Sequence, residues 1–137
     1  MFYISKITED DDILKEIINC LSSKDFDILI PTLRVLGGTM YTPDITVMDR
    51  AFQFGIVDLL TNLLNTNNAS TISEVCWILS NMVVSSSAFV SNFVEHPVLS
   101  KIMTLCQSKS ITIKKESLYV LANCVSSADV ITLERIL

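Results

Sequence analysis

The stretch Ser73-Glu-Val-Cys-Trp-Ile-Leu-Ser-Asn81 is the strongest indication of the fold, because a similar stretch, Lys114-Lys-Glu-Ser-Leu-Tyr-Val-Leu-Ala-Asn123, follows it 42 residues later. Both stretches place a carboxylate, an aromatic ring and an amide at relative positions i, i+3 and i+7. A helix turns once in about 3.6 residues, so these three side chains line up along one helix face. The two resulting strips are Glu74, Trp77 and Asn81, and Glu116, Tyr119 and Asn123.

Apolar residues repeat with the same period along the rest of the chain. Leu14, Val57 and Leu99 are spaced by 43 and then 42 positions, and five further columns have the same spacing. These columns start at Ile17, Leu21, Leu33, Leu36 and Met40. A period of about 20–50 residues is typical of solenoids, so the sequence predicts about three copies of a helical repeat of about 42 residues.

Each copy is expected to contain two long helices with a short helix or turn between them, and a short helix joins successive copies. Asp44 is expected to cap the first joining helix. We interpret residues 1–137 as one domain with approximate repeats 23–65, 66–108 and 109–137, the last partial, and with residues 1–22 ending a preceding repeat. The long helices are expected at 12–22, 28–39, 56–65, 72–84, 98–108 and 113–125, the short segments near 23–27, 68–71 and 109–111, and the joining helices at 44–52 and 87–93.

Composition excludes several classes of protein. Half of the 137 residues are hydrophobic and only 18% are charged, which argues against intrinsic disorder. No apolar run approaches the roughly 20 residues of a membrane-spanning helix, so no membrane partner is expected. The net charge of −5 argues against direct binding of nucleic acid. The four cysteines have no CxxC spacing and lie in apolar stretches, so we expect buried thiols in a reducing compartment.

Catalytic groups are not recognisable in the sequence. His96 is the only histidine, precedes Pro97 at a repeat junction, and has no accompanying nucleophile motif. Gly37-Gly38 lacks the Lys-Ser/Thr that follows in a phosphate-binding loop. We therefore expect a protein that is not an enzyme and that needs no metal or cofactor.

The two strips have the chemistry of a peptide-binding wall. An asparagine side chain can pair with both the C=O and the N–H of an extended peptide. Aromatic rings one repeat apart form slots for aliphatic stems and attract an ammonium group. Carboxylates at the rim, Glu74 and Glu116, would bind cationic heads. The wall is therefore expected to prefer extended peptides that are rich in lysine or arginine.

These residues resemble the KEAxWxxSN signature of armadillo repeats in importin-α, the adaptor for nuclear localisation signals. The segment Pro31-Thr-Leu-Arg-Val-Leu-Gly-Gly38, followed by Asp44, is similar to the PxLRxxGN segment and downstream Asp of that family. The resemblance implies an all-α, right-handed armadillo superhelix that covers the repeats around the minor nuclear-signal site. It also implies peptide-binding roles for Arg34, Asp44, Glu74, Trp77, Asn81, Glu116, Tyr119 and Asn123.

The resemblance further implies nuclear-localisation-signal peptides as partners and localisation in cytoplasm and nucleus. It implies that importin-β would bind only through a segment that this chain lacks, and we expect a fragment of a longer adaptor. Gly38 and Tyr119 depart from the Asn and Trp of the family pattern, which leaves open an armadillo scaffold with non-import partners. Terminal repeats without caps leave apolar faces open, so self-association through the repeat ends is also expected.

Overall fold

The computed structural model describes the backbone of residues 2–137 and the side chains of residues 6–129 and 131–137. Within that range the chain forms helices and no strand. The elements are α1 (Phe2–Glu9), α2 (Asp11–Asn19), the 3-10 helix η1 (Cys20–Ser22), α3 (Phe26–Thr39), α4 (Ile45–Gln53), α5 (Ile56–Leu63), α6 (Ala69–Ser85), α7 (Ser87–Glu95), α8 (Pro97–Leu105), α9 (Ile111–Ser127) and α10 (Val130–Ile136).

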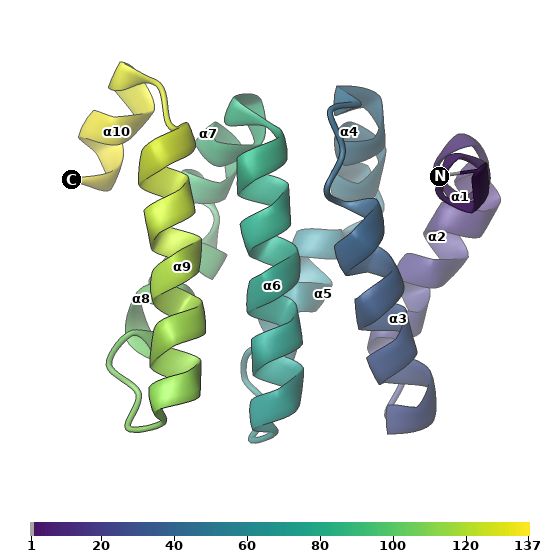
Figure 1. Cartoon of the computed structure of the whole chain (residues 1–137), viewed down its shortest axis with the longest axis horizontal. Coiled ribbons are helices and arrows are strands. Elements are labelled where there is room, and N and C mark those ends of the chain that lie inside the picture. The colour runs from purple at the N-terminus through teal and green to yellow at the C-terminus, as the bar shows by residue number, and fades with distance from the viewer. Residues whose placement is uncertain (1) are drawn as a thin grey trace.

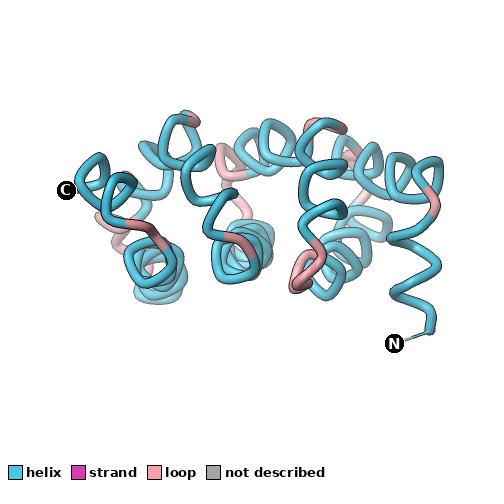
Figure 2. The backbone as a smooth tube through the Cα atoms, turned by 90° about the horizontal axis from the view of Figure 1, so that it is seen from above, coloured by secondary structure: helices cyan, strands magenta, loops and turns pink. Residues whose placement is uncertain are grey.

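The helices form two layers. The long helices α3, α6 and α9 stand side by side in one row, with the shorter helices α4, α5, α7 and α8 behind them (Figure 1). Seen from above, the three long helices occupy one side of the molecule, and the two chain ends lie at opposite ends of the row (Figure 2). We call this row the α3–α6–α9 wall. It is the arrangement that the repeat of about 42 residues predicts, with one long helix from each copy on the same side.

Side-chain caps begin most of the helices, as short polar residues do at helix N-termini. Asp44 accepts a hydrogen bond from the Thr46 backbone N–H at 2.9 Å, which confirms the predicted cap of α4. His96 caps α8, with Nδ1 accepting from the Val98 N–H at 3.0 Å. The short helices or turns expected near 23–27, 68–71 and 109–111 do not form as separate elements. Each segment instead holds the N-cap and first residues of a long helix, so α3, α6 and α9 begin at 26, 69 and 111 rather than at the predicted 28, 72 and 113.

The helix α6 lies between its two neighbours in the wall and is buried around most of its circumference. Val75, Ile78 and Met82 are buried on one side of α6. Cys76, Leu79 and Val83, which belong to the apolar columns that repeat along the chain, are buried beside them. This burial accounts for the high hydrophobic content, because a helix in a solenoid has apolar neighbours on both sides.

The corresponding apolar residues of the third repeat, on α9, are less buried than those of α6. Leu118 and Val125 are 48% and 43% exposed, whereas their counterparts Cys76 and Val83 are fully buried. The reason is that α9 is the last helix of the wall in the described part of the chain, so no further long helix packs over it there. The expectation of an open apolar face at a repeat end is met at α9.

The four thiols differ in burial. Cys76 and Cys124 are buried as expected, but Cys20 and Cys106 are only partly buried, and all four are free. Cys20 begins η1 and Cys106 follows the end of α8, where the shorter helices reach the edge of the core.

None of the helices in residues 2–137 has both the length and the apolar character that crossing a lipid bilayer would require.

Candidate functional site

A surface hollow of about 520 Å³ crosses all three helices of the wall. Its lining combines one cation, two carboxylates and an indole ring. The residues are Arg34 of α3, Ser73, Glu74 and Trp77 of α6, and Glu116 of α9. The helical period places these side chains at one level of the wall, so four of the eight sequence-predicted site residues share one hollow. We call it the central groove.

The charges in the central groove are unevenly paired. Arg34 Nε donates to Glu74 Oε1 at 3.3 Å, and the side chains are 68% and 23% exposed. Glu116 has no hydrogen bond or ion pair through its carboxylate within the described residues. One of the two carboxylates is therefore paired with a guanidinium, and the other faces the groove without a cationic partner.

The Trp77 ring lies against the backbone of the neighbouring helix. A Cβ placed on Gly37 of α3 would stand only 2.0 Å from Cζ3 of this ring, far inside normal contact distance. Trp77 is nevertheless 41% exposed. One part of the ring therefore packs on α3, and the rest faces solvent, where it can contact a ligand.

The side-chain amides of Asn81 and Asn123 differ in their hydrogen bonding. Asn81 Nδ2 donates to the Gly37 carbonyl oxygen at 2.7 Å, and this bond links α6 to α3. The second N–H and Oδ1 of Asn81 stay available, since an amide side chain has two donors and one acceptor. Asn123 is partly buried, and within the described residues its side chain forms no hydrogen bond of this kind.

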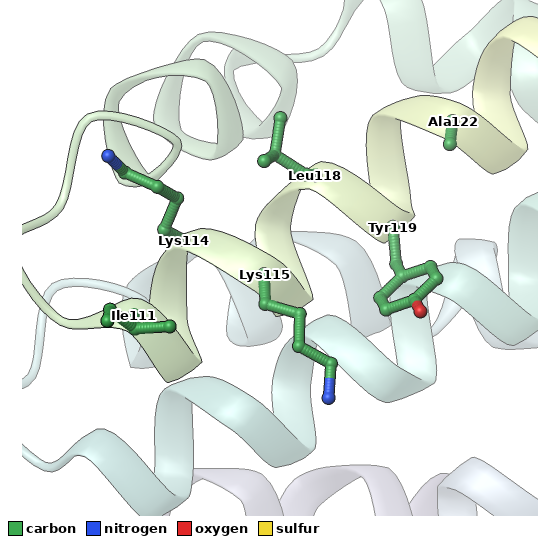
Figure 3. A pocket seen from close by; sticks show the side chains of 6 residues that line it. All are labelled: Ile111, Lys114, Lys115, Leu118, Tyr119 and Ala122. Carbon is green, nitrogen blue, oxygen red and sulfur yellow. The ribbon is translucent and has the colours of Figure 1, made fainter.

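Tyr119 is 55% exposed and lines a second hollow, of about 370 Å³. Figure 3 shows that all of the residues lining this hollow come from α9. The other members are Ile111, Lys114, Lys115, Leu118 and Ala122. Tyr119 therefore lines the hollow on α9 and not the central groove that Trp77 lines.

Asp44 lies apart from these residues. It is exposed, and its Oδ1 accepts from both the backbone N–H and the hydroxyl of Thr46 at 2.9 and 2.7 Å. The side-chain hydrogen bond from Thr46, helped by the backbone one, lowers the pKa of Asp44. The structure thus places Asp44 at the start of α4 as a helix cap, and its predicted peptide contact depends on the resemblance alone.

Two residues that support the groove were not predicted as site residues. Gly37 contacts both Trp77 and Asn81, and Ser85 ties the loop after α3 to α6. The Ser85 hydroxyl accepts from the Thr42 N–H at 3.0 Å and lies 3.1 Å from the Met40 carbonyl oxygen. The adjacent pair Gly37-Gly38 inside an apolar helix was the one available signal in the sequence, since glycine there marks close approach of another element.

Metal binding has no structural support in the described residues, where no group of three or more His, Cys, Asp or Glu side chains is placed to hold an ion.

Comparison with known proteins identifies the type of repeat. The armadillo/beta-catenin-like repeat family matches residues 50–84, which run from the end of α4 through α6. No curated protein matches the chain. The matched segment contains Glu74, Trp77 and Asn81, so the stretch from Ser73 to Asn81 lies within the family pattern.

Several solved structures that are similar to this chain are engineered or designed proteins. An engineered protein from the Northeast Structural Genomics Consortium superposes with a TM-score of 0.84 at 20% identity, over 97% of this chain and 53% of that one. A designed armadillo repeat protein in complex with the peptide (KR)4 also gives 0.84, at 17% identity over 97% and 54%. A computationally designed armadillo protein for modular peptide recognition gives 0.76, at 18% identity over 90% and 51%.

These similarities confirm the predicted fold class. The chain is an all-α solenoid of the armadillo type and spans about half the length of these three solved structures. The family match and the designed neighbours concern armadillo repeats in general. The finer resemblance to importin-α stays a prediction.

Proposed function

We propose that the α3–α6–α9 wall binds extended peptides rich in lysine or arginine, and that the chain is a nuclear-import adaptor of the importin-α type or a part of one. The observation that supports this proposal is the central groove itself. Glu74, Glu116 and the partly exposed Trp77 line this one hollow, with one guanidinium, that of Arg34, against two carboxylates. A long cationic side chain fits such a groove, with its stem on the ring and its head on a carboxylate.

Glu116 is the carboxylate that we expect to bind the cation. Glu74 shares its charge with Arg34, whereas Glu116 has no cationic partner in the described residues. A peptide ammonium that approaches Glu116 therefore gains an ion pair without breaking an existing one. At a partly exposed site such a pair contributes about 0.2–1 kcal/mol.

A binding titration tests the proposal. The wild-type chain is titrated with a fluorescent Lys/Arg-rich peptide and with a neutral peptide of equal length, at physiological salt. We expect saturable binding of the basic peptide only, with a Kd of about micromolar or weaker because a short wall orders few peptide residues. Glu116→Gln should weaken binding more than Glu74→Gln does.

The control for this titration is Glu134→Gln, on α10 and away from the groove, which removes the same charge. Absence of saturable binding by the wild-type chain would refute the proposal. Equal weakening by Glu116→Gln and Glu134→Gln would show that net charge, and not the central groove, governs binding.

The alternative is an armadillo scaffold whose ligands are not basic. Arg34 favours it, since its side chain is 68% exposed and uses only Nε toward Glu74. The rest of the guanidinium faces the groove, where it would bind a carboxylate. Tighter binding of an acidic peptide than of the basic one, lost in Arg34→Ala, would favour this alternative over nuclear import and its expected localisation in cytoplasm and nucleus.

A further inference from the structure

Two adjacent glycines of α3 have opposite surroundings. A Cβ on Gly37 would lie 2.0, 2.4 and 2.7 Å from Cζ3, Cε3 and Cη2 of Trp77, closer than real Cβ contacts allow. A Cβ on Gly38 would meet nothing within 4 Å. The six-membered part of the Trp77 ring therefore occupies the space that a side chain at position 37, but not one at position 38, would need.

The same glycine also contacts the predicted peptide clamp. The Gly37 carbonyl oxygen accepts from Asn81 Nδ2 at 2.7 Å. Trp77 and Asn81 lie about one turn apart on α6, so a single residue of α3 contacts both of them. One amide hydrogen is thereby fixed toward α3, and the orientation of the remaining N–H and Oδ1 is set before any ligand arrives.

We call the surface between two adjacent helices of the wall a slot. The α6–α9 slot lacks the contacts that Gly37 makes in the α3–α6 slot. Ser80 stands at the position that corresponds to Gly37, 43 residues later, and Tyr119 and Asn123 correspond to Trp77 and Asn81. Tyr119 is more exposed than Trp77, 55% against 41%. Among the described residues, the Asn123 side chain has no hydrogen bond to α6. The double contact thus belongs to the α3–α6 slot and to Gly37.

We propose that Gly37 is a positioning residue of the peptide groove: it seats the Trp77 ring and orients the Asn81 amide, so that the α3–α6 slot is preformed and the α6–α9 slot orders only when peptide binds. This inference rests on the proposed function. A preformed slot avoids the loss of affinity that comes from ordering side chains on binding. Residue 37 therefore affects binding without touching the peptide.

The adjacent glycines supply a matched pair of variants. Gly37→Ala and Gly38→Ala each remove a glycine from the last turn of the same helix, so both are expected to gain a similar helix propensity. Only Gly37→Ala places a methyl group in the space that the Trp77 ring occupies. Because Trp77 is the only tryptophan, its emission and its quenching by acrylamide report on the slot without a label and without peptide.

We expect Gly37→Ala to shift the Trp77 emission and quenching of the ligand-free chain and to weaken binding of the basic peptide by about tenfold. Gly38→Ala should match the wild type in Trp77 emission and quenching. Urea unfolding, followed by circular dichroism, is measured in parallel. The inference is overturned if Gly37→Ala leaves Trp77 emission and peptide Kd unchanged, or if Gly38→Ala changes them equally.

A double variant covers the case in which Gly37→Ala does not fold. Trp77→Ala removes the ring atoms that a Cβ at position 37 would meet, so Gly37→Ala should be tolerated in the Trp77→Ala background. Equal destabilisation of both backgrounds by Gly37→Ala would contradict the seating role. If the wild-type chain binds no basic peptide, the proposed function fails, while the ligand-free measurements still decide whether Gly37 positions Trp77.

Discussion

Arg34 on α3 and Glu74 on α6 form an ion pair of 3.3 Å across the central groove, between residues 40 positions apart in the chain. The pair lies at the level of the Trp77 ring and lines the same hollow. It therefore neutralises part of the surface that the sequence predicts to be acidic, and it leaves Glu116 as the unpaired carboxylate there.

Arg34→Ala should strengthen binding of a Lys/Arg-rich peptide by about twofold to fivefold, because the variant removes a repelling cation and frees Glu74. Stability should change by less than about 0.5 kcal/mol, since the pair is largely exposed. Fluorescence anisotropy gives the Kd. Lys101→Ala, on α8 in the other layer, changes the net charge equally and should have little effect. An equal gain in both variants would exclude a local role of Arg34.

The cap of α4 should make stability depend on pH. Hydrogen bonds from Thr46 lower the pKa of Asp44 in the folded chain. A lowered folded pKa means that the cap stabilises the fold above the unfolded pKa of about 3.9 and that this contribution is lost as pH falls through the folded pKa. Asp44→Asn keeps an acceptor oxygen but does not titrate, so its urea midpoint should fall less between about pH 7 and about pH 3.

The matched control for this cap is Asp49→Asn, an exposed carboxylate within α4 that caps no helix. If Asp49→Asn flattened the pH dependence as much as Asp44→Asn does, the Asp44 cap would not be its source. The second lowered carboxyl pKa, that of Asp129 at the start of α10, contributes in the same direction in both variants.

Cysteine alkylation should separate the thiols into two pairs. Burial raises the pKa of Cys76 to about 12, with a smaller contribution from the nearby Glu116, and burial also raises the pKa of Cys124 to about 12. The thiolate is the reactive form, so both should stay unmodified in the folded chain near about pH 8. Cys20 and Cys106, which are only partly buried, should react first.

Mass spectrometry of peptides from native and urea-unfolded chain measures the order of modification, with all four cysteines reacting in urea. Alkylation of Cys76 as fast as that of Cys20 in the folded chain would contradict the packing of α6 between α3 and α9.

The same substitution at two places on the wall should show which apolar residues hold the repeats together. Leu79→Ala removes a fully buried side chain of α6 and should cost about 2–5 kcal/mol of unfolding free energy. Leu118→Ala, on the open face of α9, starts from 48% exposure and should cost well under half as much. Urea unfolding measures both. Equal costs would mean that α9 is covered in solution, as self-association through this face would require.

The period, the helices and the helix face that carries the candidate site can be predicted from the sequence alone. A spacing of 42 or 43 residues between apolar columns, and of i, i+3 and i+7 within Glu74, Trp77 and Asn81, follows from helix geometry alone. Such spacing fixes which residues share a face. The cap at Asp44 was predictable from the sequence as well, because capping is a contact between residues two or three positions apart.

Which residues on that face are available to a ligand depends on how the helices pack. The Asn81 amide is tied to Gly37, Glu74 is paired with Arg34, and Tyr119 lines a different hollow from Trp77. The two tied residues contact partners 40 or more positions away, and their geometry depends on how closely α3 docks on α6. Gly37 has no side chain, and the close approach of α6 that this absence permits is a property of packing, which a helical period does not encode.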